Sequence, residues 1–277
     1  MLRLLSKVAG FYESSLNLNL ELRRFKVDNI LFCGMGVSGV VGDIVKEYLY
    51  KELKIPVIVN KNDDIPEFVN NKTLAFVITY SGKTKETLKC FRKLKNKRAK
   101  IILITSNKNL KWKNRIWVPS KMPSRVMLYF GLFPVLNVLA KLKLIKDKRN
   151  EMKKAVKALR LFKDEKKAER VAKGLFKRVP VIYSDFGYRS VGYYWKTQLN
   201  ELSKVYALQN FFPEVEHNEI EVTDVEDFEV INIKESKVDL GVMLYHMLVA
   251  DYTAYYLALL NNVDPLKTPV IDRIKKR

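Results

Sequence analysis

Residues 30–43 read Ile-Leu-Phe-Cys-Gly-Met-Gly-Val-Ser-Gly-Val-Val-Gly-Asp and decide the fold of the chain. The apolar run 30–33 is typical of a buried parallel strand. Three glycines then crowd a turn that also contains Ser38, and a helical pattern follows to about residue 53. Glycines let the backbone approach a ligand closely, and the N-terminus of a helix favours an anion. The stretch therefore predicts a phosphate site between a strand and a helix.

The glycine spacing also fits the G-x-G-x-x-G pattern of dinucleotide-binding proteins, which is weak evidence alone. Those proteins need an acidic residue at the end of the second strand to hold a ribose hydroxyl. The second strand expected here spans residues 55–59 and is followed by Asn60-Lys61-Asn62, with the first aspartate only at position 63. We therefore do not expect a nicotinamide cofactor.

A second loop of the same kind follows the next apolar strand, residues 74–79. It reads Tyr80-Ser81-Gly82-Lys83-Thr84 and leads into a helix from about residue 85. Loops at the carboxyl ends of neighbouring parallel strands can converge on one ligand. The predicted phosphate-binding residues of the two loops are Gly36, Ser38, Thr79, Ser81 and Thr84. The alternative is two ordinary strand-to-helix turns, which would not explain why both loops carry hydroxyls.

The chain as a whole predicts an α/β fold of two doubly wound domains with largely parallel sheets flanked by helices. A helical pattern covers residues 1–24 and is expected to pack outside the first sheet. Expected elements of the first domain are strands 30–33, 55–59, 74–79, 101–105 and 115–118, helices 39–53 and 85–96, and a long apolar helix ending near residue 144. Charged connecting helices are expected over 145–178, so the predicted domains are residues 1–148 and 149–277.

The second half repeats the pattern in a shorter form. The expected elements are strands 179–184, 205–208 and 228–233, a turn 185–188, helices 189–203 and 239–261, and a basic C-terminal helix within 265–275. Its strand-to-helix turn lacks the Ser/Gly signature of the first half. We therefore expect it to contribute side chains to a site but no second phosphate loop.

The composition limits the partners and the compartment. The net charge is +21, but the cations are spread along the chain among acidic residues, so we expect neither a nucleic-acid nor a membrane partner. The apolar stretch 240–260 is interrupted by His246 and Asp251, which favours a buried helix over a membrane span. Two cysteines set no disulfide framework, and residues 1–10 do not resemble a secretory signal, so we expect buried free thiols in a cytoplasmic protein.

Three segments of the second half carry residues suited to catalysis. Glu201 ends the run Trp195-Lys196-Thr197-Gln198-Leu199-Asn200-Glu201 on a helix, although a solvated carboxylate is the ordinary state of any glutamate. His217 follows Phe211-Phe212-Pro213-Glu214-Val215-Glu216 in a loop-like acidic segment, whereas His246 in an apolar helix reads as a satisfied core histidine. Lys275 belongs to the C-terminal basic helix, whose simplest interpretation is a surface cap.

The two loops, G-M-G-x-S-G and x-Y-S-G-x-T, resemble those of the sugar isomerase (SIS) domain, which binds phosphosugars. Together with P-S-R at 123–125, W-K-T-x-x-N-E, F-P-E-x-x-H-N and the basic C-terminal helix, they resemble the bifunctional phosphoglucose/phosphomannose isomerase family from residue 34 to residue 275. The resemblance implies aldose–ketose isomerisation of a hexose 6-phosphate without a metal or redox cofactor. The sequence likewise offers no clustered His/Cys ligand set.

The resemblance also implies roles for individual residues. His217, whose type titrates near neutrality, matches the group that opens the sugar ring, and Lys275 matches a lysine that assists it. Glu201 matches the base that moves the proton between C2 and C1. Arg125 matches the guanidinium that stabilises the cis-enediolate. The family resemblance further implies a homodimer in which His217 acts in the site of the partner.

Three departures from the family pattern bear on phosphate affinity and substrate preference. Val37 stands where a second glycine is usual, Thr79 and Lys83 replace the commoner serine and asparagine, and the second SIS copy is short. Two other functions remain open on the residues: another SIS isomerase acting on a different phosphosugar, and a non-catalytic phosphosugar-binding regulator. A regulator would need neither Glu201 nor His217, and the residues before the first strand are too few for a DNA-binding domain.

Overall fold

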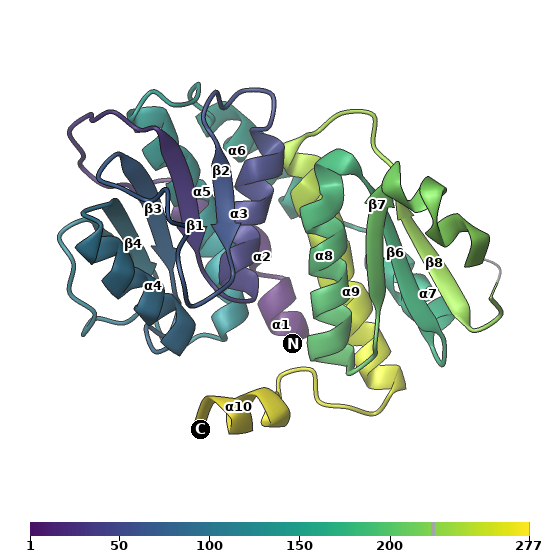
Figure 1. The fold of residues 1–277 in the computed structure, drawn as a ribbon. Coiled ribbons are helices and arrows are strands. Elements are labelled where there is room, and N and C mark those ends of the chain that lie inside the picture. Colours follow the sequence, from purple (N-terminus) through teal and green to yellow (C-terminus); the bar gives the residue numbers. More distant parts are fainter. Residues whose placement is uncertain (223–224, 277) are drawn as a thin grey trace. The chain divides into compact units, whose positions relative to one another are not determined.

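The computed structural model describes residues 1–222 and 225–276, except for the side chains of residues 275 and 276. The chain divides into two units (Figure 1). The first unit comprises Gly10–Lys153, and the second comprises Met1–Ala9 with Lys154–Arg277. The divisions fall inside α2 (Val8–Ser15) and α6 (Arg149–Arg160). Each unit is described below by itself.

The first unit is built on a parallel five-stranded sheet with the order β2-β1-β3-β4-β5. Its strands are β1 (Asn29–Cys33), β2 (Val57–Asn60), β3 (Thr73–Ile78), β4 (Lys100–Thr105) and β5 (Arg115–Trp117). Its helices are α3 (Val37–Tyr48), α4 (Lys85–Asn96), the 3₁₀ turn η1 (Ser124–Val126) and α5 (Met127–Lys141). All five strands expected from the apolar runs are present, and the predicted α/β class is confirmed.

Both faces of this sheet are covered by helices. One face carries Leu31, Ala75 and Val77, which form a buried cluster with Cys90 and Phe91 of α4. On the other face Phe32 and Phe76 stack with ring centroids 5.0 Å apart. Gly42 of α3 lies against Phe32 so closely that a Cβ would sit 2.7 Å from the ring. Since α3 also packs on α5, this second face is covered by two helices.

The second unit is built on a parallel three-stranded sheet with the order β7-β6-β8. Its strands are β6 (Val179–Asp185), β7 (Leu208–Phe212) and β8 (Phe228–Ile233). Its helices are α1 (Leu2–Leu5), α7 (Glu165–Leu175), α8 (Arg189–Gln198), α9 (Leu240–Leu260) and α10 (Pro269–Lys276). Shorter turns are η2 (Phe186–Tyr188), the π-helical η3 (Leu199–Ser203), η4 (Glu214–His217) and η5 (Glu219–Val222).

Two sequence-based predictions of local structure are wrong. Helix does not continue over residues 1–24, because α2 ends at Ser15 and the chain then runs without regular structure to β1. The short helix α1 packs on α9 of the second unit, not outside the first sheet. The strand expected at 205–208 instead forms at Leu208–Phe212, where it pairs with β6 through Val181↔Leu208.

The long apolar helix α9 is covered by α7 and α8 of its own unit. Its Asp251 is buried and accepts a 2.8 Å hydrogen bond from the Tyr194 hydroxyl, which satisfies a carboxylate inside the core. Among the described residues, no helix has the length and apolar character needed to cross a membrane.

Candidate active site

The first predicted loop joins β1 to α3 through a tight turn. A Cβ at Gly34 would lie 3.0 Å from the carbonyl oxygen of Ile78 and from the backbone of Ser38, so the loop closes against the end of β3. Gly36 caps α3 with φ 54° and ψ −133°, a conformation that favours glycine. Ser38, half-buried, lies in the first turn of α3. Its hydroxyl therefore stands at a helix N-terminus, where the backbone favours negative charge.

The second loop joins β3 to α4 and is held by its own hydroxyls. The Thr79 Oγ1 accepts a 3.2 Å hydrogen bond from the Gly82 N–H, and the Ser81 Oγ accepts one of 3.2 Å from the Lys83 N–H. Gly82 has φ 60°. Thr84, half-buried, is the N-cap residue of α4. The hydroxyls thus shape a compact turn that ends at a second helix N-terminus.

The sheet topology brings the two loops to the same edge. β1 and β3 are hydrogen-bonded neighbours, and both loops leave from their carboxyl ends. The structure therefore brings Gly36, Ser38, Thr79, Ser81 and Thr84 to adjoining loops. Two helix N-termini and several hydroxyls at one sheet edge form a place suited to a phosphate group.

Arg125 belongs to the same unit as these loops. It lies in η1, which packs against α3, and its side chain is only 6% exposed. The segment before it is tied to the second loop, because the Met122 N–H donates a 2.9 Å hydrogen bond to the Tyr80 hydroxyl. Because the Arg125 guanidinium is already shielded from water, little further desolvation is needed when it binds an anionic group.

Two residues that support the second loop were not among the predicted site residues. Tyr80 supplies the hydroxyl that accepts from Met122. Asn107 follows β4 and donates a 3.0 Å hydrogen bond to the Ser81 carbonyl oxygen. A signal for Asn107 was present in the sequence, because it follows the next strand along the sheet and must therefore lie at the same edge.

The departures at Val37 and Lys83 have structural explanations. Val37 is the first residue of α3, and the positive φ in this turn belongs to Gly36, so a Cβ at position 37 excludes no conformation that the loop needs. The Lys83 side chain is exposed beside the second loop. It can add a positive charge near a bound phosphate without taking part in the turn.

Glu201 lies in the second unit, in the π-helical segment η3 that follows α8. Its side chain is half-buried and lines a cavity of about 570 Å³, whose other walls include Tyr206 and the start of α10. π-helical turns occur preferentially at functional sites. The Lys204 ammonium connects η3 to the segment before α10, because it donates hydrogen bonds to the Glu201 carbonyl oxygen and, at 2.7 Å, to the Lys267 carbonyl oxygen.

His217 is exposed at the end of the 3₁₀ turn η4, where a loop was expected. His246 is not fully buried in the core as expected; it is half-buried, and its Nε2 lies 2.8 Å from Glu235 Oε1. Lys275 lies in α10, but its side chain is outside the described part of the chain. The structure therefore assigns His246 to a pair with a carboxylate and leaves His217 accessible.

The two cysteines are free and buried, as expected. Hydrogen bonding to Cys90 and burial raise the pKa of the Cys33 thiol, while the hydrogen bond from Cys33 lowers the pKa of Cys90. The Asn60 amide also donates to Cys90 at 3.3 Å. Over residues 1–222 and 225–276, no group of three or more His, Cys, Asp and Glu side chains is arranged to hold a metal ion.

Models of known protein families match both halves of the chain. The SIS domain model matches residues 25–116, and the model of the bacterial phospho-glucose isomerase C-terminal SIS domain matches residues 164–240 and 223–277. Bifunctional phosphoglucose/phosphomannose isomerases from Thermoplasma volcanium and Thermoplasma acidophilum are 31% and 32% identical. The alignments cover 96% and 90% of this chain and 98% and 89% of theirs.

Among solved structures, a glucosamine-6-phosphate deaminase from Thermotoga maritima has a similar fold. Its TM-score is 0.74, its sequence is 17% identical, and the match covers 97% of both chains. At that identity the similarity concerns the fold alone.

Proposed function

Because the chain belongs to the bifunctional phosphoglucose/phosphomannose isomerase family, we propose that it interconverts glucose 6-phosphate and mannose 6-phosphate with fructose 6-phosphate. The observation that carries the proposal is the pair of hydroxyl-bearing loops at the carboxyl ends of β1 and β3. We propose that Gly36, Ser38, Thr79, Ser81 and Thr84 hold the 6-phosphate there. Backbone N–H groups at helix N-termini and hydroxyls can stabilise such a group through hydrogen bonds.

The chemical steps need residues of particular types. His217 opens the ring by moving a proton between the ring oxygen and O1, and Lys275 assists that transfer. Glu201 takes the proton from C2 and returns it to C1, and the ketose results once a proton has also passed from the O2 hydroxyl to O1. Arg125 stabilises the negative charge of the cis-enediolate between these two transfers.

The second sugar substrate follows from the same intermediate. Glucose 6-phosphate and mannose 6-phosphate differ only at C2, and both give the same enediolate when the C2 proton leaves. Rotation about the C2–C3 bond of the open chain presents either face of C2 to the base. One carboxylate, Glu201, is therefore sufficient for both reactions.

We further propose a cytoplasmic homodimer in which His217 acts in the site of the partner. The exposure of His217 supports this role, because a histidine that serves another subunit must be accessible on its own. Most side chains of α5 are buried, as are more than half of those of α9. Exposed apolar residues occur in several parts of the described chain, and the C-terminal segment is one of them, with Leu266, Val270 and Ile274 49%, 57% and 62% exposed.

We propose two SIS domains, residues 1–148 and 149–277. Each matched family model lies within one of these ranges, which supports the division. The compact units differ from it chiefly in residues Met1–Ala9, which cluster with the second unit.

The decisive experiment is a coupled assay that starts from fructose 6-phosphate and detects glucose 6-phosphate and mannose 6-phosphate separately, with chelator present. Glu201→Gln is compared with Glu169→Gln, since Glu169 is a surface carboxylate paired with Lys173 in α7. We expect both products from the unchanged protein and a loss of about 10²–10⁴-fold in kcat for Glu201→Gln only.

Each other result of this assay would change the proposal. Glucose 6-phosphate alone would keep the mechanism and remove mannose 6-phosphate as a substrate. Binding of fructose 6-phosphate without turnover would indicate a phosphosugar-binding regulator. Turnover of a different phosphosugar only would indicate another SIS isomerase.

A further inference from the structure

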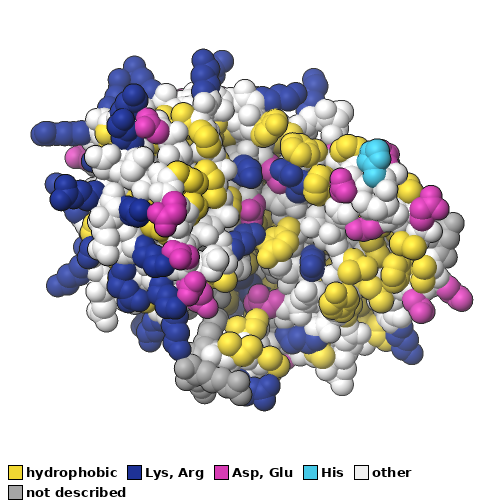
Figure 2. Space-filling view, viewed as in Figure 1, with side chains coloured by type: hydrophobic (Ala, Val, Ile, Leu, Met, Phe, Trp, Pro, Cys, Tyr) yellow, Lys and Arg dark blue, Asp and Glu magenta, His cyan; other side chains and the backbone are white. Residues whose placement is uncertain are grey.

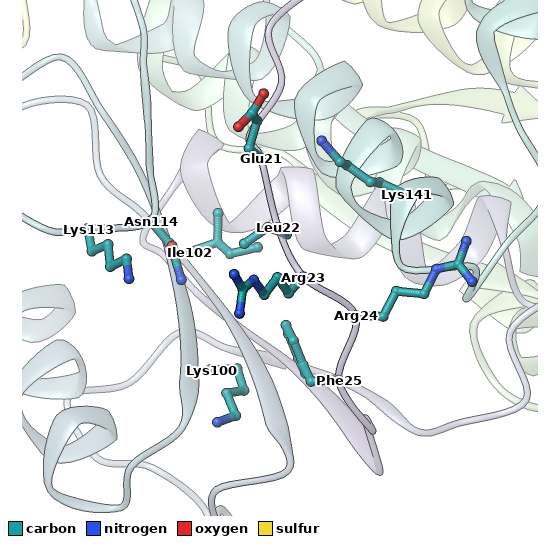
Figure 3. A pocket seen from close by; sticks show the side chains of 10 residues that line it. All are labelled: Glu21, Leu22, Arg23, Arg24, Phe25, Lys100, Ile102, Lys113, Asn114 and Lys141. Atoms are coloured by element: carbon teal, nitrogen blue, oxygen red, sulfur yellow. The ribbon is translucent and has the colours of Figure 1, made fainter.

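A cavity lined by several cations lies at the amino end of the first unit's sheet. A cavity of about 660 Å³ is bounded by residues 21–25, by the start of β4, by the loop before β5 and by the end of α5 (Figure 3). Five of its ten lining residues are Arg or Lys: Arg23, Arg24, Lys100, Lys113 and Lys141. The cavity is of the size that holds a small-molecule ligand.

This enrichment exceeds what the composition of the chain explains. Lysine and arginine make up 51 of the 277 residues, whereas they are half of the lining. Figure 2 shows how widely Lys and Arg side chains cover the part of the first unit that holds α4 and β4. Some of these cations have carboxylate partners: Lys89 and Lys93 of α4 lie 2.7 and 2.5 Å from Asp63 and Asp64.

The cations of the cavity differ in this respect. Within the described residues, no ion pair involves Arg23, Arg24, Lys100, Lys113 or Lys141. Glu21 is the single carboxylate of the lining. Like charges gathered around one cavity repel one another, and a bound anion relieves that repulsion.

The site is distinct from the sugar phosphate loops. Lys100 is the first residue of β4, and Asn114 directly precedes β5, so both lie at the amino edge of the parallel sheet. The loops with Ser38 and Ser81 lie at the carboxyl edge. A six-residue strand spans roughly 20 Å, so one hexose phosphate cannot occupy both places.

The lining also indicates what kind of anion fits. Figure 3 shows Arg23 and Arg24 leaving their extended segment on opposite sides, with the guanidinium of Arg23 on the side of Lys113 and Asn114. Guanidinium groups bind phosphate oxygens through two parallel hydrogen bonds, and a lysine adds a point charge. In this view Arg23, Lys100 and Lys113 lie on one side of that segment, and linked phosphates carry enough charge to engage several such cations at once.

We propose that this cavity binds a ligand with two or more linked phosphate groups, such as a nucleoside triphosphate or inorganic polyphosphate. An apolar wall of Leu22, Phe25 and Ile102 lies beside the cations. The Lys100 ammonium already stands 5.9 Å from the centre of the Phe25 ring. A base can stack on that ring while the phosphates meet the cations.

The test is calorimetric titration of the full chain with tripolyphosphate and with ATP, in 0.15 M salt and with fructose 6-phosphate at saturation. The variant Arg23→Gln/Lys113→Gln removes two charges of the cavity. Its matched control, Lys46→Gln/Lys51→Gln, removes two exposed charges of the same unit that do not line the cavity. We expect one site per chain, an affinity at least about tenfold weaker in the cavity variant, and no change in the control.

The two probes distinguish the sources of the linked phosphates. ATP binding tighter than tripolyphosphate, with the difference lost in Phe25→Leu, identifies a nucleotide; equal affinities identify polyphosphate. An equal loss in both double variants would overturn the proposal, because it would show diffuse attraction to net charge. Displacement of either probe by fructose 6-phosphate would also overturn the proposal. The same holds if a single-stranded RNA binds more tightly than both probes and loses that affinity in the cavity variant.

Discussion

The hydroxyl of Tyr80 accepts a 2.9 Å hydrogen bond from the backbone N–H of Met122. This contact joins the second loop, residues 79–84, to the segment that carries Arg125, through two residues that are 42 positions apart in the chain. The carbonyl oxygen of Tyr80 is held as well, because the Ser106 hydroxyl donates to it at 2.7 Å. Tyr80 therefore fixes the spacing between the proposed phosphate site and the proposed enediolate-stabilising guanidinium.

Tyr80→Phe removes this hydroxyl and keeps the ring. We expect the free energy of unfolding to fall by about 1 kcal/mol, because one hydrogen bond is lost. We also expect kcat for fructose 6-phosphate to fall about tenfold, because Arg125 is less precisely placed. Steady-state kinetics and urea unfolding measure both effects. Tyr255→Phe in α9 is the matched control, and an equal loss of kcat there would contradict the positioning role.

Thr79 serves the second loop through its hydroxyl. Its Oγ1 accepts from the buried Gly82 N–H, so Thr79→Val leaves that donor without this acceptor. We expect a loss of about 1–3 kcal/mol in stability and a higher KM for fructose 6-phosphate. Thr79→Ser retains the acceptor and should change KM less than about threefold. Equal effects of valine and serine would show that volume, and not the hydrogen bond, matters at this position.

The unusual backbone conformation of the first loop occurs at Gly36 and not at Val37. Gly36 has φ 54° and ψ −133°, so Gly36→Ala strains the turn by about 1–3 kcal/mol and should raise KM. Val37 is helical, so Val37→Gly should lower stability by about 0.5–1 kcal/mol and leave KM unchanged. Thermal unfolding and kinetics of both variants check this. A fall of KM in Val37→Gly would show that the valine restricts the phosphate after all.

Much of the fold follows from local patterns because its strands are buried. β1 and β3 are continuous apolar runs that end at polar or glycine-rich turns, and their carboxyl ends place the loops. The position of β7 differs from the predicted 205–208 because it is set by pairing with β6, which no local pattern reveals. Over residues 16–22 leucines alternate with polar residues, and this period of two indicates extended chain, in agreement with the structure. Asn137 holds this segment through the carbonyl oxygens of Leu16 and Leu18.

The sequence predicts the two loops of the candidate site better than it predicts the surroundings of Glu201 and Arg125. The phosphate loops follow from glycines and hydroxyls after strands, and the structure brings them together. The surroundings of Glu201 were not predictable, because the π-helical turn and the cavity closed by α10 depend on contacts with distant residues. Sequence spacing also does not reveal that Arg125 is buried.

The pair of Glu52 and Lys148 makes the stability of the first unit depend on pH. Burial opposes ionisation of Glu52, but the hydrogen bond from the Lys148 ammonium at 2.6 Å and the Lys146 N–H outweigh it, so the pKa of Glu52 lies below its ordinary value. The unfolded chain, with a pKa of about 4.3, then binds the proton more tightly than the folded chain. The stabilisation is therefore complete above about pH 5 and is lost as the pH falls through the folded pKa.

Glu52→Gln removes this dependence. We expect the variant to be about 1 kcal/mol less stable than the unchanged protein at pH 7, and we expect this deficit to shrink as the pH is lowered to 3, as measured by urea unfolding at both values. The exposed pair Glu67–Lys97 supplies the control, since Glu67 is 97% exposed and Glu67→Gln should leave stability unchanged. A deficit of the same size at pH 7 and pH 3 would mean that Glu52 acts through packing, because progressive protonation of the carboxylate weakens its attraction to Lys148.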